Sequence, residues 1–236
     1  MSPPIITRSL LTRQEARAHY DKSGRLEDNL SFYGRPAINR LLEHGEFGTS
    51  SEVVEFGCGA GGLAQLLLEE HLPIYARYSG FDLSETMVQL TRKRLIPFGA
   101  RVSVTKTDGR PRVPLPPAAC DRFISTYVLD LLPSQEIAKL LSQAWMILRP
   151  GGLLCLANVT NGTTLVSRMV IRAWKKLHAR DAVMVGGRRP ISVTPYLGPA
   201  SWKILYSTTV VARGVPSEVL VARPRAHAKG SHGDAS

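Results

Sequence analysis

The feature that most constrains the fold of this chain is a cluster of glycines between two apolar segments. Residues 53–64 read VVEFGCGAGGLA, with glycine at positions 57, 59, 61 and 62. The valine-rich start is typical of a buried strand, and LAQLLLEE after the glycines is typical of a helix. Glycine adopts positive φ angles and lets a ligand approach the backbone, and the first turn of a helix offers free N–H groups. The segment therefore predicts a strand, a ligand-binding turn and a helix.

The rest of the chain continues this alternation. Residues 1–45 are predicted to be helical and polar. Further strands are expected at 78–83, 100–108, 120–129 and 152–160, and further helices at 85–95, from 134 onward and at 163–180. Alternating strands and helices predict a parallel sheet with helices on both faces. A length of 236 residues fits one domain of this kind.

Composition limits the function classes. No stretch approaches the roughly 18 to 20 apolar residues of a membrane-spanning helix, and the N-terminus does not resemble a signal peptide. Three widely spaced cysteines, Cys58, Cys120 and Cys155, predict a reducing, cytoplasmic compartment without disulfides, and no metal site is expected. The net charge of +11 permits a nucleic acid or an anionic membrane as partner, but an arginine-rich surface alone also explains it.

The glycines alone do not identify the ligand. Gly57, Gly59 and Gly62 also fit the GxGxxG pattern of nicotinamide-dinucleotide sites. Neighbouring segments are more informative, because VVEFGCGAGGLA is followed by FDLSETMVQLTRKR, VTKTDG, CDRFISTYVLDLLP and ILRPGGLLCLANVT. In this order and spacing, over about residues 50–160, the five segments resemble the class I S-adenosylmethionine-dependent methyltransferases. The likeness is greatest to the subgroup that acts on small molecules and lipids.

The resemblance implies a fold and a division of the chain. The fold would be α/β and Rossmann-like, with a seven-stranded, mostly parallel sheet in an α-β-α sandwich and one antiparallel strand near the end. Residues 1–48 would form an N-terminal helical lid, 49–226 the methyltransferase domain and 227–236 a disordered tail. Within the domain, residues 163–190 would form a basic helical insertion over the acceptor pocket.

The resemblance also implies contacts with S-adenosyl-L-methionine as the cofactor. Asp82 would hold the ribose, Asp108 would meet the adenine edge, and Tyr20 would close over the methionine carboxylate. The complete implied set is Tyr20, Glu55, Gly57, Cys58, Gly59, Gly61, Asp82, Leu83, Met87, Asp108, Gly109, Ser125 and Thr126. Structural alternatives stay open, since Glu55 can cap the loop, Asp82 can cap a helix and Asp108 can belong to an ordinary turn.

The acceptor side is less defined. Tyr127, Asp130 and His178 are the candidate acceptor-binding residues, although Tyr127 can equally be a core aromatic. A sulfonium already activates its methyl group, so transfer is an in-line displacement in which the protein mainly aligns the reactants and excludes water. Candidate bases are His19, Asp130 and His178. Because no motif fixes any of them, no catalytic residue is assigned.

Residues 163–180, TTLVSRMVIRAWKKLHAR, carry five basic residues at helical spacing beside an apolar stripe of Leu165, Met169, Ala173 and Leu177. Such a helix can cover a lipid-like or anionic acceptor. It can also lie on an anionic membrane. The structural alternative is a helix that packs on the core and exposes a basic face.

Several functions compete. The main expectation is methyl transfer to a small-molecule or lipid-like acceptor, and the net charge raises an RNA methyltransferase as the alternative. However, ISTYVLDL lacks the [DNS]PP[YFW] segment of enzymes that methylate base amines, so no specific nucleic acid is expected. Five ordered motifs disfavour a nicotinamide-dependent oxidoreductase. A non-catalytic S-adenosylmethionine-binding protein stays open, and the sequence does not indicate an oligomeric state.

Overall fold

The computed structural model describes residues 10–23 and 33–225. The predicted tail and parts of the predicted lid lie outside these ranges. Seven strands within them form one sheet, in the order β3-β2-β1-β4-β5-β7-β6. The strands are β1 (Glu52–Phe56), β2 (Arg77–Asp82), β3 (Val102–Lys106), β4 (Cys120–Thr126), β5 (Leu148–Val159), β6 (Trp202–Ala212) and β7 (Val215–Pro224).

Strand directions confirm the predicted sandwich. Strands β1 to β5 pair in parallel, and β7 runs antiparallel to both of its neighbours, β5 and β6. The β6–β7 hairpin turns at Arg213 and Gly214, whose φ angles are 50° and 83°. Two consecutive positive φ angles match the right-handed twist of a tight hairpin. The fold is thus a Rossmann-like α/β sheet with one reversed strand.

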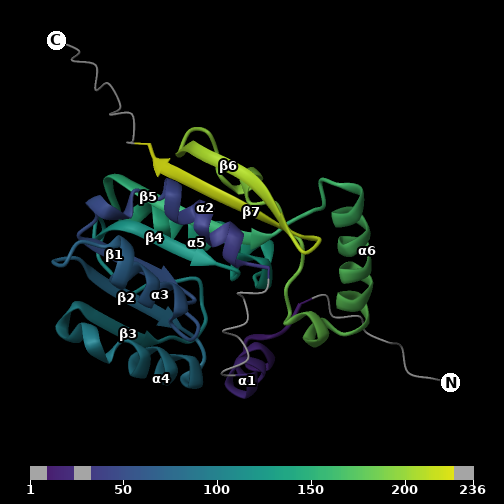
Figure 1. The fold of residues 1–236 in the computed structure, drawn as a ribbon, viewed down its shortest axis with the longest axis horizontal. Helices are drawn as coiled ribbons and strands as arrows, with labels where there is room; N and C mark the ends of the chain where they lie inside the picture. The colour runs from purple at the N-terminus through teal and green to yellow at the C-terminus, as the bar shows by residue number, and fades with distance from the viewer. Residues whose placement is uncertain (1–9, 24–32, 226–236) are drawn as a thin grey trace, which may run out of the picture.

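Six α-helices of four or more residues accompany the sheet within the described ranges. They are α1 (Arg13–Ser23), α2 (Arg35–His44), α3 (Gly62–Leu66), α4 (Glu85–Arg94), α5 (Ser134–Ile147) and α6 (Leu165–Arg180). Buried side chains of α2, α3 and α4 share one core cluster, whereas those of α5 belong to another. These helices therefore cover opposite faces of the sheet. Figure 1 shows α1 and α6 beyond the carboxyl ends of the parallel strands.

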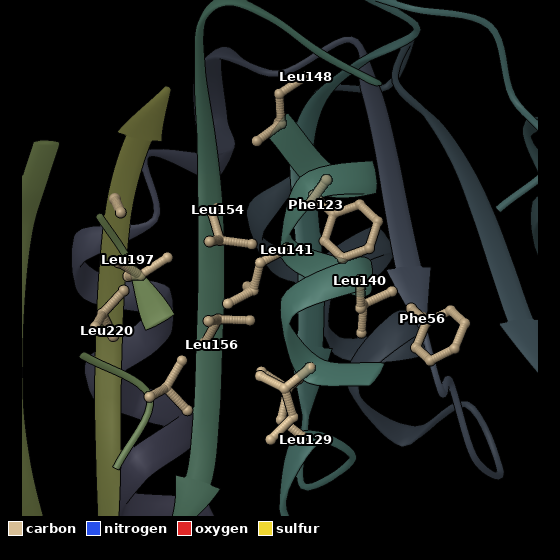
Figure 2. Close-up of a cluster of buried hydrophobic side chains, with 14 of the residues drawn as sticks. Phe56, Phe123, Leu129, Leu140, Leu141, Leu148, Leu154, Leu156, Leu197 and Leu220 are labelled. Atoms are coloured by element: carbon tan, nitrogen blue, oxygen red, sulfur yellow. The ribbon is translucent and has the colours of Figure 1, made fainter. Parts of the chain in front are cut away.

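The core under α5 is the larger cluster. Leu140 and Leu141 of α5 pack against Phe123 of β4 and against Leu154 and Leu156 of β5 (Figure 2). The helix turns one apolar face toward the sheet, as its spacing of aliphatic residues predicts. This packing holds β4 in place, and the last residue of β4, Thr126, lines the cavity described below.

Two details differ from the sequence expectation. The LRPGG segment is not a separate turn but an irregular start of β5, where Cys120 pairs with Leu148 and Arg122 with Leu153. The other difference concerns α6, which buries Ser167, Ile171 and His178. Its apolar stripe, from Leu165 to Leu177, is exposed. Helical spacing alone does not tell which of two apolar stripes meets the core.

Candidate functional site

A cavity of about 580 Å³ opens at the carboxyl ends of β1, β2 and β4. Its size lies in the range of small-molecule pockets. The glycine loop after β1 forms its floor, α1 and the start of α2 form one wall, and residues 126–136 form another. Ligands of open α/β sheets bind at this edge, because the turns after the strands converge there.

Three glycines shape the floor for different reasons. All three have positive φ angles, 81° at Gly57, 53° at Gly59 and 80° at Gly61. A Cβ on Gly57 would lie 2.2 Å from Cγ2 of Val128, and a Cβ on Gly61 would lie 2.8 Å from Cγ2 of Thr91. A Cβ on Gly59 would meet nothing within 4 Å. Protein neighbours therefore exclude side chains at two positions, and only Gly59 leaves its space open toward the cavity.

Asp82 joins the glycine loop to the end of β2. Its carboxylate accepts hydrogen bonds from the backbone N–H of Gly59 and of Ser84, both at 2.9 Å. Burial raises the pKa of Asp82, although these N–H groups oppose the rise. Leu83 and Met87 continue the wall from this acid, with apolar side chains. A carboxylate beside an open backbone and an apolar wall can bind a hydroxylated ligand with a flat apolar part.

Glu55 is the buried acid under the loop. It is 1% exposed, lines the cavity, and accepts a hydrogen bond of 2.6 Å from the Tyr78 hydroxyl. Burial raises its pKa to about 7, and the charge of Asp82 adds to the rise while the Tyr78 hydroxyl opposes it. This carboxyl can therefore hold or release a proton near neutral pH.

Tyr127 begins the turn after β4 in an unusual conformation. Its φ angle is 57°, which costs about 1 kcal/mol or more for a non-glycine residue. The strain is held by a bond of 2.7 Å from its backbone N–H to Ala157 and one of 2.9 Å between its hydroxyl and that of Ser217. The ring is buried but still contributes to the cavity wall.

Helix α1 is fastened over the cavity at several points. Asp21 accepts hydrogen bonds from the Ser84 hydroxyl at 2.5 Å and from the Thr86 backbone N–H at 3.3 Å, at the start of α4. The Tyr20 hydroxyl donates to the carbonyl of Gly186 at 3.1 Å. Arg13 forms an ion pair with Glu136 of α5. These contacts join α1 to three other parts of the fold around the cavity.

Comparison with known proteins bears on this arrangement. Residues 53–152 match the family described as methyltransferase domain. An uncharacterized methyltransferase of Geobacillus sp. (strain WCH70) is 33% identical over 101 residues, which cover 43% of this chain and 44% of the relative. Another, from Anoxybacillus flavithermus (strain DSM 21510 / WK1), is 32% identical over 121 residues, 51% of each chain. The matched segments span about half the length of these curated relatives.

Residues 53–152 are thus similar to a methyltransferase domain, and they extend from β1 through β4 with the glycine loop. Solved structures share the fold of this chain. The [4+2]-cyclase SpnF superposes with a TM-score of 0.70 at 16% identity, covering 91% of this chain and 97% of that chain. The mitomycin 7-O-methyltransferase MmcR superposes with a TM-score of 0.61 at 15% identity, covering 80% and 53%. At such identities the likeness concerns the fold alone.

The fold brings many of the predicted residues to one cavity. Those that line it are Tyr20, Glu55, Gly57, Cys58, Gly59, Asp82, Leu83, Met87, Gly109, Thr126 and Tyr127. They come from α1, from the ends of β1, β2 and β4 and the turns that follow them, from the turn after β3, and from α4. Their roles as ligand contacts remain predictions.

Three predicted cofactor-binding residues do not reach the cavity wall. The space beside Gly61 is filled by Thr91. Asp108 turns outward, where its carboxylate accepts from the Arg110 backbone N–H at 2.9 Å. Ser125 is buried within the sheet and donates to the carbonyl of Phe56 at 3.0 Å. Thr91 thus fills the space beside Gly61, and the side chains of Asp108 and Ser125 are hydrogen-bonded to backbone groups away from the cavity wall.

The two tentative acceptor residues other than Tyr127 are also away from the wall. Asp130 is fully buried and accepts a hydrogen bond of 3.0 Å from the Val159 backbone N–H. His178 is buried with its Nε2 atom 3.3 Å from the carbonyl of Gly187. The third candidate base, His19, makes an edge-on ring contact with Tyr20 and is not part of the wall either.

Other residues of the cavity wall were not predicted. Leu131 and Leu132 directly follow the predicted end of β4, so their place in the chain was a usable signal. Ile38 of α2 and Arg188 had no such signal, because neither belongs to a motif. Among the described residues no group of three or more His, Cys, Asp or Glu side chains could hold a metal ion.

Proposed function

We propose that the protein is an S-adenosylmethionine-dependent methyltransferase that acts on a small-molecule or lipid-like acceptor. The observation that carries the proposal is the cavity itself. Asp82 and the open backbone of Gly59 offer polar groups to a ligand. Val128, Leu131 and Leu132 add apolar surface to the wall of the same cavity. One cavity thus combines a cofactor-like subsite with room for an apolar partner.

The residues present fit the cofactor of the family. The space over Gly59 admits a ligand against the backbone, and the lone pairs of Asp82 that the two N–H groups leave can accept hydroxyl donors. Leu83 and Met87 supply an apolar wall for a flat base. Glu55, once ionised, would favour a positively charged ligand nearby. Bound there, the cofactor would supply an activated methyl group.

The chain itself would then contribute alignment and exclusion of water. Helix α1 closes one side through Tyr20 and Asp21, and Val128 and Tyr127 limit the space where an acceptor would meet the cofactor. Holding two reactants in line is a large part of the catalysis that such a displacement requires. The three candidate bases His19, Asp130 and His178 do not line the cavity, which favours acceptors that need no proton removal by these side chains.

The comparisons support an acceptor of modest size without naming it. MmcR is an O-methyltransferase of mitomycin. SpnF is a cyclase, so the shared fold does not by itself assign methyl transfer. The described residues include no helix long and apolar enough to cross a bilayer. The apolar wall favours a small apolar acceptor over a nucleic-acid strand, whose phosphates need basic walls.

A calorimetric titration tests the proposal. S-Adenosylmethionine and its demethylated product should bind with micromolar affinity, and NADH should not. Asp82→Asn, which keeps the shape of the side chain, should weaken both by about tenfold or more, because a charged hydrogen bond is worth roughly 1.5 to 3 kcal/mol. Glu43→Gln, on the exposed side of α2, is the matched control. Binding of NADH alone would overturn the assignment.

We further propose peripheral contact between α6 and an anionic membrane. The helix exposes Leu165, Val166 and Met169, which are 64–78% accessible. Its sequence, LVSRMVIRAWKKLHAR, contains five lysines and arginines and no acid. Exposed apolar side chains among cations are typical of helices that lie in a membrane interface. Sedimentation with phosphatidylglycerol vesicles, but not with phosphatidylcholine vesicles, is the expected result.

A further inference from the structure

Tyr78 is linked to the cavity through the acid under the glycine loop. Its hydroxyl donates a hydrogen bond of 2.6 Å to Oε2 of Glu55, and both residues are 1% exposed. Glu55 lines the cavity, whereas Tyr78 does not. Among the described residues, the Glu55 side chain makes no other hydrogen bond, so its Oε1 atom stays available to a ligand in the cavity.

The sequence of β2 makes room for this contact. Tyr78, Gly80 and Asp82 alternate along the strand and therefore share one of its faces. Gly80 is the partner of Glu55 on the neighbouring strand β1. A Cβ on Gly80 would lie 3.0 Å from the Tyr78 hydroxyl oxygen and 3.1 Å from Sγ of Cys58. A side chain at position 80 would thus crowd the tyrosine ring, and its absence lets the hydroxyl reach the acid.

Among the described residues, the sheet and the glycine loop present acidic or neutral groups to Glu55. The Asp82 carboxylate and the Tyr78 hydroxyl come from β2, and Cys58 comes from the loop. Burial raises the pKa of the Cys58 thiol well above its usual range, so the thiol stays neutral. On the other side of β1, Ile124 of β4 is the partner of Glu55. Neither neighbouring strand thus offers Glu55 a positive charge.

The helices over the cavity and over this face of the sheet do carry cations. Arg13 of α1 and Arg35 of α2 line the cavity, and Arg94 of α4 donates to a backbone carbonyl of the glycine loop. None of these three cations shifts the pKa of Glu55, which burial raises to about 7 against the opposing effect of the Tyr78 hydroxyl. A cationic ligand would therefore supply the positive charge that the ionised form of Glu55 needs.

We propose that Tyr78 is a positioning residue, whose hydroxyl holds the Glu55 carboxylate with Oε1 toward a cationic ligand, and that binding of this ligand releases one proton from Glu55 to solvent. This role rests on the proposed function, whose cofactor carries an ammonium and a sulfonium group. Burial raises the pKa of Tyr78 well above its usual range, so its hydroxyl remains a donor. A positive charge beside Glu55 favours the ionised carboxylate, and the proton leaves.

Calorimetry on the full chain measures the proton release. S-Adenosylmethionine and its demethylated product, S-adenosylhomocysteine, are titrated from pH 5.5 to 8.5 in buffers of different ionisation enthalpy. Binding should release nearly one proton at pH 6 and almost none at pH 8, because Glu55 of the free protein titrates at about 7. Affinity should rise by about tenfold between these two pH values. Glu55→Gln, which cannot titrate, should show neither effect.

Tyr78→Phe keeps the ring and removes the hydroxyl. Without this donor the pKa of Glu55 rises further, so the midpoint of the affinity profile should move up by about one pH unit. Affinity at pH 7 should then fall by about fivefold and approach the wild-type value at pH 8.5. The ¹³C resonance of the Glu55 carboxyl, identified by its loss in Glu55→Gln, reports the same midpoint without ligand. Tyr206→Phe, on β6, should leave both midpoints unchanged.

The outcomes separate this role from the proposed function. Wild-type affinity that does not change with pH overturns the proton release. A Tyr78→Phe affinity that falls by the same factor at every pH indicates a structural role and overturns the positioning. Release with both ligands assigns the effect to their shared ammonium and release with S-adenosylmethionine alone to the sulfonium, and either result supports the proposal. If neither ligand binds at any pH, the proposed function fails, and the carboxyl resonance decides whether Tyr78 controls the ionisation of Glu55.

Discussion

At the scale of the residue, Glu55 links the fold to pH. In the unfolded chain it loses its proton near its ordinary pKa of 4.5, whereas the folded protein keeps the proton up to about 7. Between these values the folded state binds more protons, so the free energy of unfolding falls as pH rises and the contribution is gone above 7. The difference of about 2.5 units corresponds to about 3 kcal/mol.

Glu55→Gln should remove this slope. A glutamine oxygen can still accept from the Tyr78 hydroxyl, so the variant keeps the contact and loses only the titration. Urea unfolding at a series of pH values from 4.5 to 7 measures the effect. The variant should lose less stability than the wild type across that range, and Asp130, whose pKa is also raised, leaves a smaller slope in both. Parallel curves would contradict the prediction.

Two glycines of the same loop should behave differently when replaced by alanine. Gly57→Ala forces a Cβ to within 2.2 Å of Val128 and strains a φ of 81°, so loss of stability should dominate. Gly59→Ala meets no neighbour, and its strain of roughly 1 to 2 kcal/mol leaves the chain folded. Its methyl group would occupy space over the cavity floor, so S-adenosylmethionine affinity should fall by about tenfold or more. Thermal unfolding and calorimetry, measured on both variants, distinguish the two effects. Equal stability of the two variants would contradict the expected loss of stability in Gly57→Ala.

The sequence could predict these residues only in part. Gly59 and Asp82 follow from the motif, because both belong to turns directly after strands. The reason for Gly57 could not be predicted, since it depends on Val128, which is distant in the chain. Asp108 and Ser125 were expected at the wall, but side-chain direction after a strand depends on local φ and ψ angles. The Asp108 carboxylate accepts from the Arg110 backbone N–H, and the Ser125 hydroxyl donates to the Phe56 carbonyl.

At the scale of the element, α1 is bonded to the start of α4 through Asp21, whose backbone carbonyl also accepts from the Thr86 hydroxyl at 3.2 Å. Asp21 accepts from the Ser84 hydroxyl and the Thr86 backbone N–H at the start of that helix. An anion at a helix N-terminus is stabilised by the unpaired N–H groups and by the helix dipole. The position of α1 over the cavity is thus tied to α4, which also contributes Met87 to the wall.

Asp21→Ala should release α1 while the sheet stays folded. Loss of these side-chain hydrogen bonds should cost roughly 1.5 to 3 kcal/mol of stability. Most of this loss should affect the contact between α1 and α4. Hydrogen exchange of the α1 amides should become faster, and S-adenosylmethionine affinity should fall, while exchange in β1 and β4 should stay slow. Glu43→Gln on α2 serves as control. Unchanged protection of α1 would show that Arg13 and Tyr20 suffice to hold it.

The sequence predicted the positions of helices and strands better than it predicted which of their faces pack on the core. The strand and helix positions follow from periodicity, and α6 at Leu165–Arg180 lies within the predicted 163–180. Which stripe of α6 meets the core did not follow, because Ile171 and half-buried Trp174 form a second apolar stripe beside the one from Leu165 to Leu177. The short segment after α6 has no periodic pattern, so the place of Arg188 came only from the structure.

At the scale of the whole molecule, charge and apolar surface coincide on one side. The chain carries a net charge of +11, and α6 contributes five cations to it with no acid. Figure 1 shows α6 standing out beside the body of the sheet. The cavity opens at the carboxyl ends of β1, β2 and β4. An anionic surface that attracts the whole molecule would therefore meet exposed apolar side chains on this helix.

Electrostatic attraction and burial of apolar side chains should have separable effects on vesicle binding. Attraction by charge weakens as salt is added, because the screening length shortens from about 10 Å at 0.1 M to about 3 Å at 1 M. Burial of apolar side chains in the interface does not share this dependence. Lys175→Gln with Lys176→Gln should thus lower affinity for phosphatidylglycerol vesicles, by roughly 1 kcal/mol per lysine, and flatten the dependence on salt.

Leu165→Ser with Met169→Ser should act on the other force. Two exposed apolar side chains that insert contribute together at least about 1.5 kcal/mol, so affinity should fall by about tenfold or more while the salt dependence stays that of the wild type. Both double variants change exposed positions, so the fold should be unaffected. If the serine variant binds as well as the wild type, α6 contacts the vesicle by charge alone, and the apolar stripe has no membrane role.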